Sequence, residues 1–250
     1  MSRLGWIRLL LISGLVGLLE LACRLAWIKK ATMIPPSEMA QNLWRLLRIG
    51  KLNNDIAATL GNVGIAFLLC VSVGFALGVV IHSLPRLRRV LDPLLATWYA
   101  VPFFVFYPIF IVIFGLNRLP IIVIGFLFGV VAMIVSTLNG LDRIPPVLLK
   151  TARLHHMPPL SVALRIKLPS ALPHLFTGVK LSVAYSFIGV IASEFILSGG
   201  GLGYSIAYAY NNFDNRTMYA LMLFILLLVG SINAVLHVWE QRLIARRGGR

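Results

Sequence analysis

The stretch Lys150-Thr151-Ala152-Arg153-Leu154-His155-His156, followed ten residues after His156 by Ile166-Lys167-Leu168-Pro169, lies in a basic, proline-punctuated segment from about Leu141 to Lys180. Long apolar runs flank this segment on both sides. So long a polar segment is unusual in an otherwise apolar chain, and it suggests that a partner outside the membrane binds there. The segment is therefore the first candidate for a binding surface.

Composition identifies the chain as an integral membrane protein. Its 250 residues are 59% hydrophobic and only 12% charged, whereas soluble domains average about 25% charged residues. The net charge of +15 is carried mainly by the segments between apolar runs, which fits the enrichment of Lys and Arg in cytoplasmic loops. This distribution argues against nucleic acid as a partner.

Six apolar runs are long enough to cross a bilayer as helices, which takes about 20 residues each. Backbone groups need internal partners in lipid, and the alternation expected of barrel strands is missing, so the prediction is an all-α protein with six transmembrane helices. We place the spans near Ile7–Ile28, Thr59–Ile81, Leu94–Leu116, Leu119–Leu141, Leu181–Leu197 and Met218–Val238.

The distribution of Lys and Arg sets the orientation. The two later loops on one side contain only Arg118 and Arg216, so the richer side is cytosolic, with both termini and the long loop. The basic residues of the richer side are Arg3, Arg8, Arg86, Arg88, Arg89, Arg143, Lys150, Arg153, Arg165, Lys167, Lys180, Arg242, Arg246, Arg247 and Arg250.

The first connection runs against this rule. It places Lys29, Lys30, Arg45, Arg48 and Lys51 on the outer side. We expect an extended piece starting near residue 34, followed by an interfacial amphipathic helix over residues 42–49.

The chain is accordingly divided into three parts. Residues 1–58 hold the first span and the outer interfacial segment. Residues 59–240 form a core of five spans with the cytosolic loop 141–180, and residues 241–250 are a basic cytosolic tail.

Proline pairs organise the long loop. Because proline suits the first turn of a helix and breaks it elsewhere, Pro145-Pro146 and Pro158-Pro159 predict a short helix over Pro146–Met157. A second helix over Pro159–Lys167 should stop before Pro169. By composition alone, docking of a cytosolic partner and simple contact with lipid head groups are equally good interpretations of this loop.

The loop is similar to the cytosolic signature of ABC-importer permeases, which is Glu-Ala-Ala, three residues, Gly, nine residues, then Ile-x-Leu-Pro. Residues 168–173, the span through Glu194 to Gly201-Leu202-Gly203-Tyr204, and Leu91-Asp92-Pro93 resemble the nitrate/sulfonate/taurine branch of these permeases. The likeness covers about residues 59–239. It implies the type I ABC-importer permease architecture in a bacterial inner membrane.

The resemblance also implies partners and a docking surface. Such a permease works as a homodimer with two cytosolic ABC ATPase subunits and an external solute-binding protein. The residues expected to contact the ATPase are Leu149, Lys150, Thr151, Ala152, Arg153, Leu154, His155, His156, Met157, Ile166, Leu168 and Pro169.

Three of these positions depart from the family pattern. Lys150 replaces Glu, Thr151 replaces Ala, and His156 replaces the Gly that normally supplies a positive φ, which histidine adopts at some cost. A lysine at 150 favours an acidic partner where the family glutamate would not.

The fifth span carries a stripe of small and hydroxylated residues, with spacings of three, four and seven that place them on one helical face. Such a stripe allows close helix packing in lipid or lines a watery path. The resemblance puts this span beside the path, which leaves the two interpretations level. The stripe contains Ser182, Tyr185, Ser186, Gly189 and Ser193, and the candidate path residues are its last four members together with Tyr107 and Asn139.

Energy for transport should come from outside this chain. Spans two, three and four hold no charged residue, which argues against an ion-coupled carrier. Gly50-Lys51 fails the phosphate-loop pattern, so ATP is expected on a partner subunit, with no cofactor in this chain. The scattered histidines predict no metal site, and no catalytic constellation predicts an enzyme.

Two carboxylates in apolar surroundings are interpreted as structural. Glu20 and Arg24, four residues apart, are expected to pair on the first span. Glu194 is expected to act near the outer interface, with Arg118 as its candidate partner.

The function expected is thus a permease subunit of an ATP-driven importer for a small organic or inorganic anion such as a sulfonate, taurine or nitrate. An importer of pyrimidine-type vitamin precursors is an alternative. A membrane scaffold that recruits a cytosolic partner without transport is another.

Overall fold

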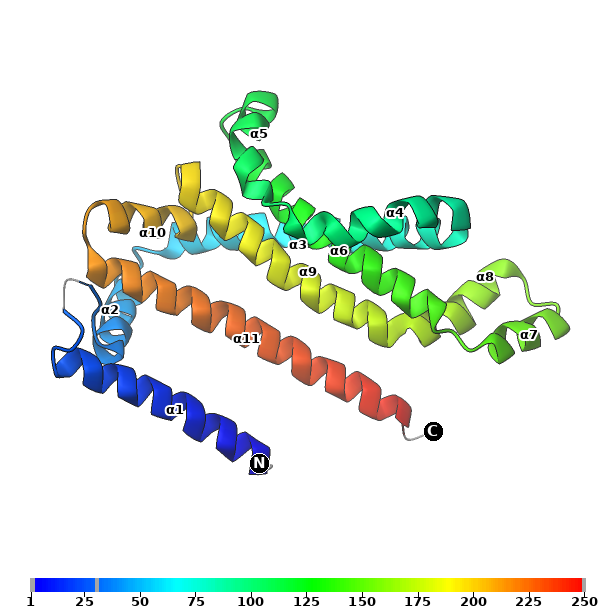
Figure 1. Ribbon diagram of the computed structural model, residues 1–250, viewed down its shortest axis with the longest axis horizontal. Helices are drawn as coiled ribbons and strands as arrows, with labels where there is room; N and C mark the ends of the chain where they lie inside the picture. The colour runs from blue at the N-terminus through cyan, green and yellow to red at the C-terminus, as the bar shows by residue number, and fades with distance from the viewer. Residues whose placement is uncertain (1–2, 30–31, 249–250) are drawn as a thin grey trace. The chain divides into compact units, whose positions relative to one another are not determined.

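The computed structural model describes residues 3–29 and 32–248, and no strand occurs in this part of the chain (Figure 1). This agrees with the predicted all-α class. The α-helices are α1 (Arg3–Arg24), α2 (Pro36–Ile49), α3 (Asn53–Ser83), α4 (Pro85–Thr97), α5 (Tyr107–Phe114), α6 (Leu119–Asp142), α7 (Pro146–Leu154), α8 (Pro159–Val162), α9 (Leu168–Leu197), α10 (Leu202–Asn211) and α11 (Asn215–Gly248). Two 3-10 turns (Trp98–Ala100, Phe103–Phe106) and one π-turn (Ala163–Lys167) join them.

Five of the described helices are long and apolar enough to cross a membrane, and a sixth span is added if a bent pair of helices is counted as one. The single helices cover Gly5–Arg24, Asn53–Ser83, Leu119–Asp142, Pro159–Ile196 and Asn215–Arg242. Five of the six predicted spans are therefore confirmed in order, and the sixth is present if the bent pair, at the place of the predicted third span, is one span.

The third span is not the single helix predicted over residues 94–116. Pro85–Ala100 and Phe103–Phe114 are bent by 85° at the break between them (Figure 1). Val101 is extended, with φ −83° and ψ 117°, because a residue before proline avoids the helical region. Pro102 then starts a new direction, and Pro108 fits in the first turn of α5, where no backbone N–H is needed.

The chain separates into two compact units, residues 1–58 with 194–228, and residues 59–193 with 229–250. The boundaries fall within α3, α9 and α11. Each unit has its own core.

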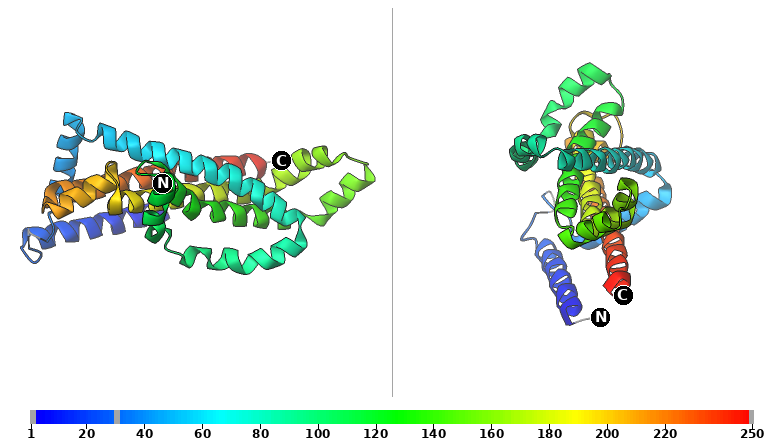
Figure 2. Two further views of the ribbon diagram at one scale, coloured as in Figure 1. Left: turned by 90° about the horizontal axis from the view of Figure 1, so that it is seen from above. Right: turned by 90° about the vertical axis from the view of Figure 1, so that its right-hand side faces the viewer.

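In the second unit, α6 is the central helix, and most of its residues are buried. It runs beside α9 (Figure 2) and contacts α3 through closely spaced small residues. A Cβ on Gly74 of α3, for example, would lie 2.7 Å from the Cβ of Met133. The indole N–H of Trp98 donates to the Leu127 carbonyl over 2.8 Å, which attaches the end of α4 to α6.

In the first unit, α2, the beginning of α3, α10 and the beginning of α11 share one apolar core. The buried side chains of this core are Leu43, Leu52, Leu202, Ile206, Ala209, Met218, Ala220 and Leu221. Side chains of each helix are needed to bury those of the others, so α2 is part of the folded unit and not a loose connection.

Helix α2 begins earlier than the predicted residue 42. Pro35 is extended, and Pro36 starts the helix, as suits proline at the first helical position. Gly50 ends it in the left-handed conformation, with φ 72°.

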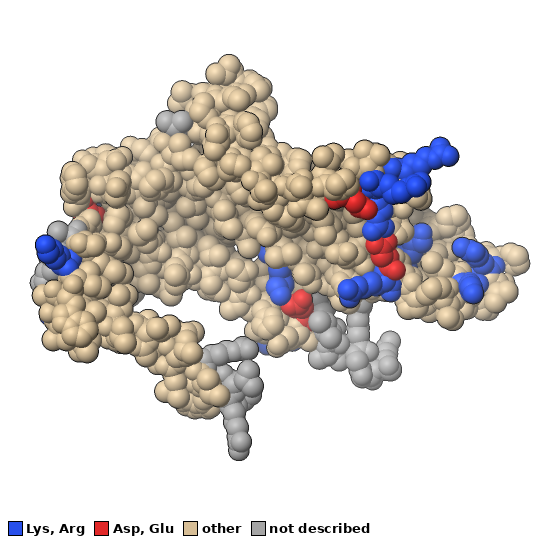
Figure 3. Space-filling view, in the orientation of Figure 1, with Lys and Arg blue, Asp and Glu red and all other residues tan. Residues whose placement is uncertain are grey.

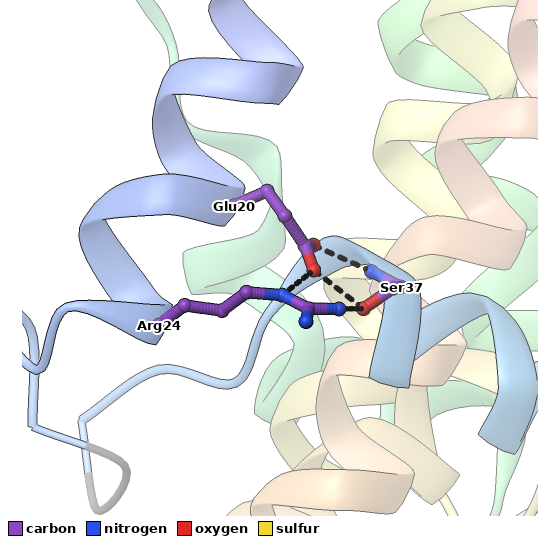
Figure 4. Close-up of polar contacts among 3 residues, drawn as sticks. All are labelled: Glu20, Arg24 and Ser37. Carbon is purple, nitrogen blue, oxygen red and sulfur yellow. Dashed lines mark hydrogen bonds and ion pairs between the residues drawn. The ribbon is translucent and has the colours of Figure 1, made fainter.

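The expected pair on α1 is confirmed and extends further than predicted (Figure 4). Arg24 Nε lies 2.6 Å from Glu20 Oε1. The same carboxylate accepts hydrogen bonds from the Ser37 backbone N–H (3.0 Å) and hydroxyl (2.7 Å). Glu20 thereby satisfies an N–H of the first turn of α2, which would otherwise lack a partner, and joins the two helices.

Candidate functional site

Helix α7 begins at Pro146 as predicted, but it ends at Leu154, before the predicted Met157. The N–H groups of His156 and Met157 donate to the carbonyls of Arg153 and Ala152, each over 3.0 Å. This is the hydrogen-bond pattern of a Schellman motif, which closes a helix with one left-handed residue. His156 is that residue, with φ 48°. His156 thus takes the conformation that glycine supplies in the family pattern.

His156→Gly should therefore stabilise the end of α7 by about 1 kcal/mol, because glycine adopts positive φ without the steric cost paid by histidine. Amide protection of the last turn of α7 in hydrogen exchange should rise roughly fivefold.

His155→Gly is the matched control. His155 has φ −85°, so glycine there gains nothing and loses more conformational entropy on folding. Protection should fall in this variant, and a change of the same sign in both variants would contradict the explanation.

Most of the predicted docking residues on α7 and in the turn after it are exposed. Ala152 is buried against the rest of the loop, whereas Lys150, Thr151, Arg153 and both histidines are exposed. The side chain of Leu154 is 79% exposed. The side chains of Val147 and Leu160 are similarly exposed, at 68% and 71%. These apolar side chains lie beside basic residues on the same surface of the loop.

A cleft of about 310 Å³ separates α7 from the following helix. Its walls are the predicted docking residues Leu149, Ala152, Arg153 and Met157 together with Pro159, Val162 and Lys167. Figure 3 shows Lys and Arg gathered at the end of the second unit that carries α4, α7 and α8. Ile166 and Pro169 are half-buried and Leu168 is exposed.

The predicted stop before Pro169 is wrong. Helix α8 passes through the π-turn into α9, so the fifth span also begins well before the predicted Leu181. The N–H of Leu168 donates to the carbonyl of Ala163, five residues back, in place of the usual four. Pro169 has no backbone N–H and would interrupt an ordinary α-helix. The π-turn directly before it shifts the backbone hydrogen bonds by one residue, and the helix continues through Pro169.

Within the second unit, the stripe on α9 packs against α6. Ser182 Oγ donates to the Gly129 carbonyl over 3.2 Å. A Cβ on Gly189 would lie only 2.8 Å from the Cα of Gly125. Ser193 is buried as well, with its hydroxyl bonded to the Gly189 carbonyl at 2.7 Å. In this conformation these contacts fit close helix packing.

The other candidate path residues differ in exposure. Tyr185 is half-buried, and its ring centre lies 5.3 Å from that of Tyr99, a residue that sequence reasoning did not select. Tyr107 is buried and Asn139 is exposed. Ser186 is fully buried and its Oγ lies 3.5 Å from the sulfur of Cys70.

Sequence reasoning also missed an ion-pair cluster at the start of the loop. The guanidinium of Arg88 on α4 donates to both oxygens of Asp142 on α6, over 2.7 and 2.6 Å. His82 Nε2 of α3 lies 3.4 Å from the same carboxylate. The cluster ties three helix ends together where the loop begins. The sequence signal that could have indicated this cluster is the presence of residues of opposite charge, Arg88 and Asp142, near the ends of predicted spans.

Glu194 is fully buried within the first unit. Its Oε2 accepts a hydrogen bond from the Gly203 N–H (3.2 Å), at the start of α10. Asp55 Oδ1 accepts from the Gly201 N–H (3.2 Å). The two carboxylates thus hold the glycine turn before α10, where helix-end N–H groups need acceptors. Pairing of Glu194 with Arg118 stays a prediction, because Arg118 belongs to the other unit.

Together these features define a class: a polytopic all-α membrane protein whose long basic loop, with α7 and α8, joins two of the candidate spans. Residues 52–248 match the family model described as binding-protein-dependent transport system inner membrane component. The chain belongs to this family. It is a permease subunit of an ABC importer and spans the inner membrane several times.

Named relatives agree with this assignment. The chain is 28% identical over 190 residues to a nitrate import permease protein of Leptolyngbya laminosa, covering 76% of this chain and 68% of the relative. It is 24% identical over 248 residues to a protein of Bacillus subtilis (strain 168) assigned as an aliphatic sulfonates transport permease, covering 98% and 90%.

A solved structure shares the fold. The MetNI methionine ABC transporter, in an inward-facing conformation, matches with a TM-score of 0.63 at 19% identity. The match covers 81% of this chain and 96% of that one.

Proposed function

We propose that this permease imports a small anion, such as nitrate, a sulfonate or taurine, at the expense of ATP hydrolysed by separate subunits. Two ATPases would bind two copies of this chain at the docking residues, which lie on and just after α7, in the π-turn and at the beginning of α9. An external solute-binding protein would deliver the solute on the other side. Both chain ends would face the cytosol.

The observation that carries the docking proposal is the surface of α7 and α8. Leu154 and Leu160 expose apolar side chains beside Lys150 and Arg153, so a partner would bury apolar area and complement positive charge. ATP-driven closure of the ATPases would then move α7 and α8 and, through the unbroken helix, α9. Binding of nucleotide to the ATPases and binding of the loaded binding protein would both shift the equilibrium between the inward-facing and the outward-facing state of the path.

The choice of an anion rests on the named relatives and on the path candidates. None of these candidates is a carboxylate, and Tyr185, Ser186 and Asn139 carry hydroxyl or amide donors that suit anionic oxygens. Ser186, Gly189 and Ser193 are packed in the present conformation. They would line the path only after α6 and α9 move apart, whereas Tyr185 and Asn139 are already accessible, and Tyr107 would join them.

Co-purification and reconstitution test the proposal. The ATPase encoded with this permease should co-purify with it, and its hydrolysis in proteoliposomes should rise when the binding protein carries solute. Absence of the ATPase, or hydrolysis indifferent to the binding protein, would contradict the importer mechanism. A thermal-shift screen of the binding protein with anions and with pyrimidine precursors would decide between the two solute classes.

Lys150→Glu is expected to weaken ATPase binding at least tenfold, because it reverses an exposed charge that we propose faces acidic groups of the ATPase. The measurement is the amount of ATPase retained on the immobilised permease as salt is varied.

Arg89→Glu is the matched control for this variant. Arg89 is also exposed but lies on α4, outside the docking residues, so the variant should retain the ATPase. Normal assembly and transport by the Lys150→Glu variant would disprove the pairing.

A further inference from the structure

Helix α2 has two distinct faces. Met39 and Leu43 are buried in the first unit. The other side exposes Trp44 (61%) and Ile49 (69%) together with Arg45 and Arg48. We call these four exposed residues the α2 face. The guanidinium carbon of Arg48 lies 5.1 Å from the centre of the Trp44 ring, a cation–π distance that holds the two side chains together.

The first unit fixes the direction of this face. Glu20 accepts hydrogen bonds from Ser37 at the start of α2 (Figure 4), and Leu43 lies in the core shared with α10 and α11. Just before α2, the Tyr219 hydroxyl donates to the Thr32 carbonyl over 2.6 Å. The helix is therefore held at its beginning and along its buried side, and the α2 face is presented in a fixed orientation.

The chain also fixes the level of α2 relative to the membrane. It follows the candidate span Gly5–Arg24, and only residues 50–52 separate its end from the next span, Asn53–Ser83. The first span ends and the next span begins on the same side of the membrane. Helix α2 connects them and therefore lies at that surface of the bilayer. An exposed tryptophan and exposed arginines are typical of the interfacial zone of a membrane.

The charge on this segment needs a separate explanation. Lys29, Arg45, Arg48 and Lys51 lie on the side that the remaining Lys and Arg assign to the exterior, so the positive-inside preference does not account for them. Glu38 is the one carboxylate on α2. The segment thus keeps an excess of positive charge at a membrane surface.

We propose that the α2 face binds the head groups of anionic phospholipids. Arg45 and Arg48 would contact phosphate oxygens, which the planar guanidinium binds in a bidentate manner. Trp44 and Ile49 would lie at the boundary between head groups and acyl chains. A soluble anion would use the arginines but leave these apolar side chains in water, so a lipid explains the whole face.

Native mass spectrometry of the full-length permease, titrated with phosphatidylglycerol or phosphatidylcholine, tests the proposal without requiring transport. Phosphatidylglycerol should bind more tightly. Arg45→Gln with Arg48→Gln should weaken it roughly twenty-five-fold, since each basic residue near an anionic surface contributes about fivefold. Arg45→Lys with Arg48→Lys, which keeps the charge, should stay within about threefold of the unaltered protein, and Trp44→Ala should lose affinity for both lipids.

Three results would overturn the proposal: equal affinity for the two lipids, unchanged binding in the glutamine variant, or the same loss in the lysine and glutamine variants. Displacement of the lipid by millimolar inorganic phosphate would instead identify a site for soluble anions. Because the readout is lipid binding, failure here leaves the importer proposal untouched, and the reverse also holds.

Discussion

Gly189→Leu is expected to remove most solute uptake by forcing α9 away from α6. A Cβ on Gly189 would lie 2.8 Å from the Cα of Gly125 and 3.1 Å from the Ile124 carbonyl oxygen. Both neighbours are backbone atoms, so no side-chain rotation can make room. Overpacking of this kind costs about 3 kcal/mol, roughly a hundredfold in the equilibrium between packed and separated helices. Uptake in proteoliposomes and thermal unfolding of the purified permease measure the effect.

Gly230→Leu is the matched control in α11. No atom lies within 4 Å of a Cβ built on Gly230, so the same change in a membrane helix should leave uptake and unfolding close to those of the unaltered protein. If both variants behaved alike, the loss at Gly189 would reflect a general effect of leucine and not the approach of α6 to α9.

Gly201→Ala is expected to destabilise the turn before α10 by about 3 kcal/mol. Gly201 has φ 98°, a conformation that costs a residue with a Cβ about 1–3 kcal/mol. The added methyl group would also collide with the carboxyl group of the buried Glu194. Moving that carboxylate would break its hydrogen bond to Gly203 and leave a buried acceptor without its partner. Thermal unfolding should report the loss.

The neighbouring glycine provides the control. Gly200 has no atom within 4 Å of a built Cβ, and its hydrogen bonds with Ser198 use only its backbone. Gly200→Ala should therefore unfold within about 0.5 kcal/mol of the unaltered permease. A large loss at Gly200, or none at Gly201, would show that the carboxylate does not fix this turn.

Local signals were sufficient for much of the fold. Apolar length gave the number of spans, and the proline pairs gave the beginning of α7. Proline also misled, because its effect depends on its surroundings. Pro169 predicted a helix stop, but the π-turn before it allows the helix to continue. Pro102 produced an 85° bend that a hydropathy average does not register.

Pairing between distant segments could not be predicted. Spacing placed Ser182, Ser186 and Gly189 on one face, but it did not tell whether that face meets α6 or water. The relevant signal on α6 is Gly125 and Gly129, four residues apart, which only the folded unit sets opposite the stripe. The acceptor role of Glu194 likewise depends on a turn whose position the sequence does not fix.

The π-turn has a mechanical consequence. Figure 1 shows α8 and α9 meeting at a bend, yet the backbone hydrogen bonds continue through it. From Pro159 to Ser186 the helix measures about 40 Å along its axis, at 1.5 Å per residue. Because the backbone is continuous through the bend, α8 acts as a lever arm on α9. A sideways displacement of α8 is therefore expected to rotate α9 about the axis of α9. Such a rotation would withdraw Gly189 from α6 and turn the ring of Tyr185 toward the space that the glycine had closed.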